Sequence, residues 1–189
     1  MNQPKNALPE VDAPLLHRCD ARGVHVLTLN TPARFNVLGE SMLGALESAF
    51  EQVRADSAAR VVVLGAIGKA FCAGHDLKEM KAHSDLDYFQ SLFARCSRFM
   101  LAIQQLPVPV IARVQGLATA AGCQLVAQCD LAVAVDTARF GVNGIDAGLF
   151  CATPSVPLVR NMAPKLAMEM LVTGEFITAA EAKMRGLVN

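Results

Sequence analysis

The chain has 189 residues, and 53% of them are hydrophobic, which is enough apolar material for the core of one folded domain and excludes a largely disordered chain. Lys and Arg total 17, and Asp and Glu also total 17, so the formal net charge is zero. This balance, with no basic stripe, argues against a nucleic-acid interface and against a helix that lies on a membrane surface.

In chain order, the first predicted elements are a leader and a hairpin. Residues 1–14 contain no apolar segment and no Arg/Ser-rich pattern, so we interpret them as a flexible leader and not as a signal or transit peptide. The remaining residues, 15–189, are predicted to form a single domain. Residues 15–19 and 24–30 are separated by a turn that contains Gly23, and this pattern predicts a β-hairpin.

Two long helices and a buried strand are predicted next. Apolar residues recur at helical spacing over residues 41–56, which predicts an amphipathic helix. The apolar run 60–66 predicts a strand buried on both faces, and residues 68–80 are predicted to be a loop that turns into a helix. A second long helix is predicted over residues 86–105. Its apolar stripe comprises Phe89, Phe93, Cys96, Met100 and Ile103.

The order of strand, small-residue loop and helix then recurs. Residues 110–114 predict a strand, residues 116–122 a loop of small residues, residues 123–129 a short helix and residues 130–136 another strand. A repeated alternation of strands and helices is typical of layered α/β folds. We therefore predict an α/β domain.

The C-terminal part is predicted to be helical. One helix is expected over residues 163–174, and another over 178–186, where Thr178 and Glu181 match a capping box. The chain ends just after this helix, at the start of an apolar run, so we expect a further C-terminal segment. The longest apolar run, residues 108–135, is interrupted by charged and amide side chains and does not predict a membrane span.

The cysteines and histidines indicate no metal centre. None of the six cysteines forms a C-x-x-C pair, and most lie in apolar runs, which favours free thiols in a reduced cytoplasmic protein. The four histidines have no metal-ligand spacing relative to these cysteines, so no metal site is expected.

Two loops of small residues, "FCAGHD" and "GLATAAG", each follow an apolar strand and precede a helix. Small side chains leave the backbone accessible, and the first N–H groups of a helix have no partner within the helix. Two such loops side by side can offer two N–H donors to one carbonyl oxygen, which is an oxyanion hole. The alternative is that the small residues serve only close packing of helix against strand.

Three ordered blocks resemble the crotonase, or enoyl-CoA hydratase/isomerase, superfamily. They are "GKAFCAGHDLKEM", "PVPVIARVQGLATAAGCQLVAQCDLAVA" and "LAMEMLVTGEFITAAEAKMRGLVN", and the similarity covers residues 15–189. The sequences of the first two blocks most resemble the branch called enoyl-CoA hydratase domain-containing proteins. The resemblance implies a spiral of ββα units, assembly as a homotrimer or a dimer of trimers, and an acyl-CoA thioester as ligand. Coenzyme A would enter as part of the substrate, with no separate cofactor.

The resemblance also implies roles for particular residues. The two oxyanion-hole donors would be the backbone N–H groups of His75 and Ala121. The contacts with coenzyme A would come from Arg34, Phe35, His75, Asp76, Leu77, Lys78 and Ala121.

Hydratases of this superfamily use two glutamates, and the matching positions here are Gln124 and Gly144. An amide does not exchange protons near neutral pH, so ordinary hydration is expected to be weak or absent. Asp146 could serve as a replacement base, although a solvated or capping role is the alternative. The side chain of His75 is expected to point away from the reaction. Two functions stay open, namely an enzyme that forms an acyl-CoA enolate and a non-catalytic acyl-CoA-binding or assembly protein.

Overall fold

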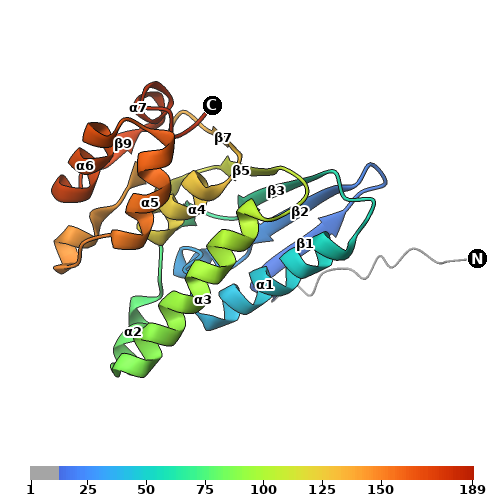
Figure 1. Ribbon diagram of the computed structural model, residues 1–189, viewed down its shortest axis with the longest axis horizontal. Coiled ribbons are helices and arrows are strands. Elements are labelled where there is room, and N and C mark those ends of the chain that lie inside the picture. The colour runs from blue at the N-terminus through green and yellow to red at the C-terminus, as the bar shows by residue number, and fades with distance from the viewer. Residues whose placement is uncertain (1–12) are drawn as a thin grey trace, which may run out of the picture.

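The computed structural model describes residues 13–189, so the predicted leader, 1–14, lies almost entirely outside the described residues. A five-stranded sheet forms the centre of one layer (Figure 1), with the strand order β1-β2-β3-β5-β7. Its first pair is antiparallel and the others are parallel. The strands are β1 (Leu15–Cys19), β2 (Val24–Leu29), β3 (Val61–Ala66), β5 (Val110–Val114) and β7 (Leu131–Ala134). All five lie where the sequence predicts strands.

A second, four-stranded sheet has the order β4-β6-β8-β9. Its members are β4 (Ala70–Cys72), β6 (Leu117–Thr119), β8 (Arg139–Gly141) and β9 (Ile177–Thr178). β4 and β6 were predicted to be parts of loops, and that prediction is wrong. Strands of three residues are too short to show a period of two, and neighbouring strands rather than their own residues hold them in place.

The two sheets are connected as a spiral. The chain places β3 in the first sheet and β4 in the second, then forms α2 (Leu77–Ala82) and α3 (Leu86–Gln104). It repeats this path through β5 and β6 into α4 (Ala121–Gln128), and again through β7 and β8 into α5 (Ala152–Asn161). The structure therefore confirms the predicted α/β fold built from a spiral of ββα units.

The two long helices lie side by side against the first sheet (Figure 1). α1 (Glu40–Ala55) buries the predicted stripe, including Phe50, whose ring packs edge-to-face on that of Phe99 of α3 with centroids 5.2 Å apart. The predicted stripe of α3 is wrong at two of its five residues, because Phe93 is 37% exposed and Phe89 is half-buried, whereas Leu92 and Phe99 are buried. The first turns of α3 project beyond the core, so the apolar face there is available to a ligand.

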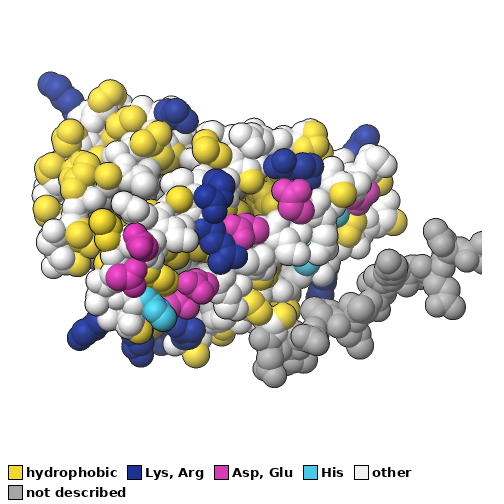
Figure 2. Space-filling view, turned by 60° about the horizontal axis from the view of Figure 1, so that its bottom comes forward, with side chains coloured by type: hydrophobic (Ala, Val, Ile, Leu, Met, Phe, Trp, Pro, Cys, Tyr) yellow, Lys and Arg dark blue, Asp and Glu magenta, His cyan; other side chains and the backbone are white. Residues whose placement is uncertain are grey.

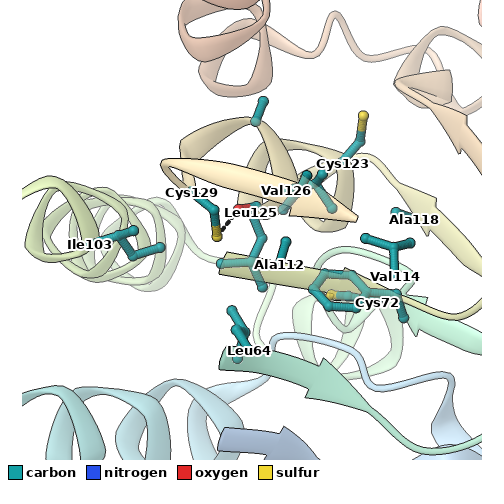
Figure 3. Packing of buried hydrophobic residues seen from close by; sticks show 14 of the residues in the cluster. Leu64, Cys72, Ile103, Ala112, Val114, Ala118, Cys123, Leu125, Val126 and Cys129 are labelled. Carbon is teal, nitrogen blue, oxygen red and sulfur yellow. Dashed lines mark hydrogen bonds between the residues drawn. The ribbon is translucent and has the colours of Figure 1, made fainter. Parts of the chain in front are cut away.

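The core between the layers is apolar and continuous. All eight residues of α4 are buried, and Figure 3 shows Leu125 of this helix, and Cys129 directly after it, pointing toward Ala112 of β5 and Ile103 of α3. The Cys129 thiol donates a hydrogen bond to the carbonyl oxygen of Leu125 at 3.2 Å. A wholly buried helix needs small residues on the side that touches strands, and an added Cβ at Gly122 would lie 2.0 Å from the Cys72 carbonyl oxygen.

The C-terminal part is helical as predicted, with α6 (Pro164–Thr173) and α7 (Ala179–Met184). The capping box of Thr178 and Glu181 is confirmed, with both reciprocal hydrogen bonds present. The sequence analysis does not predict α5, which contains Pro154 and Pro157. No helix within residues 13–189 has the length and apolar character needed to cross a membrane.

Exposed hydrophobic side chains gather over the C-terminal helices. Figure 2 shows them at the end of the molecule where Figure 1 places α5 and α6. They include Leu149, Phe150, Val156, Val159, Met168, Val172 and Phe176, each more than 40% exposed. An exposed apolar area of this kind is typical of ligand-binding grooves and of contacts with other polypeptides.

Candidate functional site

The second sheet brings three loops together at one edge. β4, β6 and β8 are parallel neighbours, so their carboxyl ends lie on the same side of the sheet. Ligands of open α/β sheets bind outside the carboxyl ends of such strands. His75 lies three residues beyond β4, Ala121 two residues beyond β6, and Gly144 three residues beyond β8. The spiral thus collects residues from distant parts of the sequence.

The first two loops touch. Gly74 has a φ of +90°, and a Cβ added there would lie 2.9 Å from the Cβ of Ala120 and 3.2 Å from the amide nitrogen of Ala121. Ala120 itself has φ 51° and ψ −123°, a conformation that L-residues rarely adopt. The glycine makes this close approach possible, and the strained alanine turns the chain sharply from β6 into α4.

The backbone N–H groups of His75 and Ala121 have no hydrogen-bond acceptor within residues 13–189. Ala121 is the first residue of α4, and the N–H at this position of a helix has no acceptor within the helix. His75 forms an isolated bridge with Leu38, but there the Leu38 N–H donates to the Gly74 carbonyl at 2.8 Å and leaves the His75 N–H unused. Both donors are therefore free to bind another group.

A cavity of about 840 Å³ adjoins these two residues. Of the predicted site residues, it is lined by Arg34, Phe35, His75, Asp76, Leu77, Lys78, Ala121, Gly144 and Asp146. Gln124 is the one predicted site residue absent from its wall. Phe93, which was predicted as a core residue, lines the cavity as well, together with Leu149 and Phe150, for which no role was predicted. Their apolar side chains are 37% to 56% exposed, a property that the structure reveals and the sequence does not.

Cations lie beside the first loop. The Arg34 guanidinium forms an ion pair with Asp76, whose carboxylate is buried and also caps α2 by accepting from the N–H groups of Lys78 at 3.0 Å and Glu79 at 3.2 Å. Asp76 therefore positions Arg34 and the start of α2, because its carboxylate is already bonded to both. The Arg34 side chain remains 61% exposed and the Lys78 side chain is exposed, so both can still bind an anion.

The His75 ring lies within the wall of the cavity. It packs edge-to-face on Phe93, with ring centroids 5.1 Å apart, and its Nδ1 lies 3.4 Å from the Leu38 carbonyl oxygen. Burial lowers the pKa of His75 from its ordinary value, so the ring is neutral near pH 7. A neutral ring held against Phe93 offers an apolar surface and gives no proton to a ligand at that pH.

Gln124, on α4, does not line the cavity. It is buried, and its Oε1 has no hydrogen-bond partner within the described residues. A buried, unpaired amide oxygen is costly, and a water molecule or a bound polar group would remove that cost.

A series of side-chain hydrogen bonds runs along the third loop. The Thr119 hydroxyl donates to Asn143 Oδ1 at 2.5 Å, and Asn143 Nδ2 donates to Asp146 Oδ2 at 3.4 Å. Asp146 is exposed, in a short 3-10 helix (Asn143–Ala147). Gly144 has no room for a side chain, because an added Cβ would lie 2.7 Å from both the Leu149 carbonyl oxygen and Cys151 Sγ.

The cysteines near the site are poor nucleophiles. Burial raises the pKa of Cys72 to about 12 and that of Cys123 to about 12. Cys151 lines the cavity, and burial raises its pKa as well. Since the thiolate is the reactive form, these thiols are chiefly small apolar groups at neutral pH.

Comparison with known proteins gives relatives across most of the chain. A family model described as enoyl-CoA hydratase/isomerase matches residues 20–189. Enoyl-CoA hydratase domain-containing protein 3, mitochondrial, from Xenopus laevis is 47% identical over 88% of this chain and 57% of its own length. The chain therefore spans little more than half of that curated relative.

Solved structures agree with the sequence matches. An enoyl-CoA hydratase from Mycobacterium smegmatis superposes with a TM-score of 0.92 at 62% identity, covering 93% of this chain and 68% of that one. Human enoyl coenzyme A hydratase domain-containing protein 3 superposes with a TM-score of 0.89 at 44% identity, covering 93% and 69%. With the family model matched over residues 20–189 and the ββα spiral shared with these structures, the chain belongs to the enoyl-CoA hydratase/isomerase family.

Proposed function

We propose that this chain binds an acyl-CoA thioester with its carbonyl oxygen between the amides of His75 and Ala121. The observation that carries the proposal is that these two N–H groups adjoin one cavity and have no acceptor within residues 13–189. When a proton leaves the α-carbon, negative charge moves onto the thioester oxygen. Each aimed donor stabilises such a charge by about 2.7–4 kcal/mol, and the positive end of the α4 dipole acts in the same direction.

Coenzyme A itself would lie along the first loop. Arg34 and Lys78 supply positive charge for its phosphates, while Phe35 and Leu77, 53% and 64% exposed, supply apolar surface. Asp76 holds Arg34 in place through their ion pair. Coenzyme A enters as part of the substrate, so no separate cofactor is part of the proposal.

The reaction would be one that needs enolate stabilisation more than a pair of carboxylates. Gln124 cannot act as a general base near neutral pH, and Gly144 has no side chain. Each missing acid or base typically contributes about 10²–10⁴-fold to the rate, so hydration of an enoyl-CoA is expected to be weak or absent. Isomerisation, thioester hydrolysis and decarboxylation stay within reach of the site. The exposure of Asp146 and its bond to Asn143 favour a local structural role over that of a base.

The second candidate is a non-catalytic acyl-CoA-binding or assembly protein on the same scaffold. The buried Gln124 amide, whose oxygen is unpaired within the described residues, favours it, because no titratable group occupies that position. Both candidates bind acyl-CoA and gain thermal stability from it, so binding alone does not separate them. Enolate formation separates the two candidates, because only the enzyme removes an α-proton from the bound thioester.

The experiment is exchange of α-protons in deuterated water. The chain is incubated with short- and medium-chain acyl-CoAs, and deuterium incorporation is followed by NMR, with a sample lacking protein as the control. Exchange above that background supports the enzyme. Thermal stabilisation by acyl-CoA without exchange over hours supports the binder. A chain that shows neither exchange nor stabilisation refutes both candidates.

We also propose that the chain assembles as a homotrimer or a dimer of trimers. The exposed apolar side chains of α5 and α6 and of the edge strand β7, where Leu131 and Val133 are 45% and 59% exposed, support a contact between subunits. Light scattering coupled to size-exclusion chromatography tests this assembly, and a monomer at micromolar concentration would refute it.

For location, we propose a cytoplasmic protein, because all six cysteines are free and four of them are buried. The Xenopus laevis relative is named as mitochondrial, which makes a mitochondrial location the alternative. Fractionation of cells that express the complete protein separates the two locations.

A further inference from the structure

A group of side chains of metal-ligating types lies beside the turn of the β1–β2 hairpin, and none of its residues lines the cavity. Cys19 at the end of β1 is directly opposite His25 at the start of β2. Opposite residues of an antiparallel pair place their side chains on the same face, and His17, two residues before Cys19, shares that face. Asp56, the C-cap residue of α1, contacts this face, where its carboxylate approaches the ring of His25.

The distances between these groups suit one small cation. His25 Nε2 lies 3.1 Å from Asp56 Oδ2 and 3.5 Å from Cys19 Sγ, and all three atoms lie within 4.8 Å of one another. A tetrahedral Zn²⁺ ion with ligand distances of about 2.0–2.3 Å keeps its ligands about 3.3–3.7 Å apart. Only small side-chain movements are therefore needed to bring Cys19 Sγ, His25 Nε2 and Asp56 Oδ2 to ligand distance from one ion.

The arrangement does not suit a catalytic triad. In a triad, the nucleophile and the carboxylate face different nitrogens of the histidine. Here both Cys19 and Asp56 face the same nitrogen, Nε2 of His25, and the other nitrogen faces His17 at 2.9 Å.

We propose that Cys19, His25 and Asp56 form a binding site for Zn²⁺. On binding, the Cys19 thiol releases its proton to water, and the thiolate and the Asp56 carboxylate together balance the two charges of the ion. The proton of His25 moves to Nδ1 and is donated to Nε2 of His17, which orients the ligand ring from behind. Cys19 is exposed, so water completes the fourth position.

The surroundings support this assignment. Cys19, His25 and Asp56 combine soft, borderline and hard donors, a set that suits Zn²⁺ better than Mg²⁺ or Ca²⁺. Asp20 adds negative potential but is held by Arg22 at 2.6 Å, so it acts at a distance and does not compete for the ion. The ion would tie the hairpin to the end of α1, which already meet where His25 Nε2 lies 3.1 Å from Asp56 Oδ2.

The test uses the whole chain, freed of metal with a chelator and then titrated with Zn²⁺ and, as a spectroscopic probe, Co²⁺. We expect one ion per chain, a higher melting temperature with Zn²⁺, and a thiolate-to-cobalt absorption band. Cys19→Ser should abolish that band, and Asp56→Asn, which keeps an oxygen for the Ala58 N–H, should weaken binding by about tenfold or more.

Cys151→Ser is the matched thiol control, because Cys151 is likewise not fully buried but lies at the cavity. It should bind Zn²⁺ and show the cobalt band as the unmodified chain does. Both test positions are at least partly exposed, so circular dichroism can verify that the variants remain folded. If the unmodified chain binds no Zn²⁺, or if Cys19→Ser binds as tightly and keeps the band, the assignment is overturned.

Discussion

The contact between the two small-residue loops can be tested with a single methyl group. Gly74→Ala places a Cβ 2.9 Å from the Cβ of Ala120, 3.2 Å from the amide nitrogen of Ala121 and 3.3 Å from the Thr119 carbonyl oxygen. The methyl group therefore meets backbone and a short side chain, which cannot rotate away. It also covers the amide that we propose as one of two donors to the thioester oxygen.

Two separate costs add up at this position. The positive φ of +90° costs an alanine about 1–2 kcal/mol, and the close contacts cost about 1–3 kcal/mol more. Gly148→Ala is a matched control, because Gly148 has a φ of +75° but nothing within 4 Å of an added Cβ. It incurs the first cost without the second. The difference in unfolding free energy between the two variants thus measures the contact itself.

The functional consequence is measured with two ligands. An acyl-CoA thioester has the carbonyl oxygen that the two amides would bind, and its thioether analogue lacks that oxygen. We expect the unmodified chain and Gly148→Ala to prefer the thioester, and Gly74→Ala to lose this preference. If the unmodified chain exchanges α-protons, Gly74→Ala should lower that rate by about 10²–10³-fold. Equal stability of the two variants, together with an undiminished thioester preference in Gly74→Ala, would show that the added methyl group neither strains the two loops nor covers the Ala121 amide.

Three further outcomes follow from the same structure. Ala120→Gly should raise the unfolding free energy by about 0.5–1 kcal/mol in urea titrations, because it removes an unfavourable positive φ; a loss of stability would contradict this. Burial lowers the pKa of both His17 and His75, so the unfolded chain binds more protons in acid, and stability should fall as the pH drops from about 7 toward 5. His75→Gln should flatten that fall, and an unchanged profile in thermal melts would count against it. Thr178→Ala should cost about 1 kcal/mol through loss of the cap that holds Glu181, and a change in melting temperature within error would argue that α7 does not need it.

Much of the fold follows from local patterns in the sequence. The long helices and the strands of the first sheet have clear apolar periods or continuous apolar runs, and the structure places them at the predicted residues. The two loops of small residues also point to the site, because backbone exposure needs small side chains. Predicted cavity residues such as Arg34 and Lys78 depended on family resemblance, since nothing in their spacing alone links them to Ala121.

The rest depends on contacts that no local pattern records. β4, β6 and β8 have three residues each and exist because parallel neighbours pair with them. α5 contains Pro157, which cannot donate a helical hydrogen bond, yet the helix is retained where Leu158 packs into the core. The Cys19–His25–Asp56 group joins residues up to 37 positions apart, so no short ligand spacing in the sequence predicts it.

The proposed site and the second sheet form one unit. Strands of three residues are not stable alone, so β4, β6 and β8 persist only while their neighbours and the core hold them. The amides of His75 and Ala121 emerge where β4 and β6 end, and their relative position is therefore set by the pairing of Cys72 with Ala118. Any change that weakens this pairing should loosen the two donors together, before it unfolds the first sheet. Loss of thioester preference would then precede loss of global stability, because the donors depend on the shorter and less stable of the two sheets.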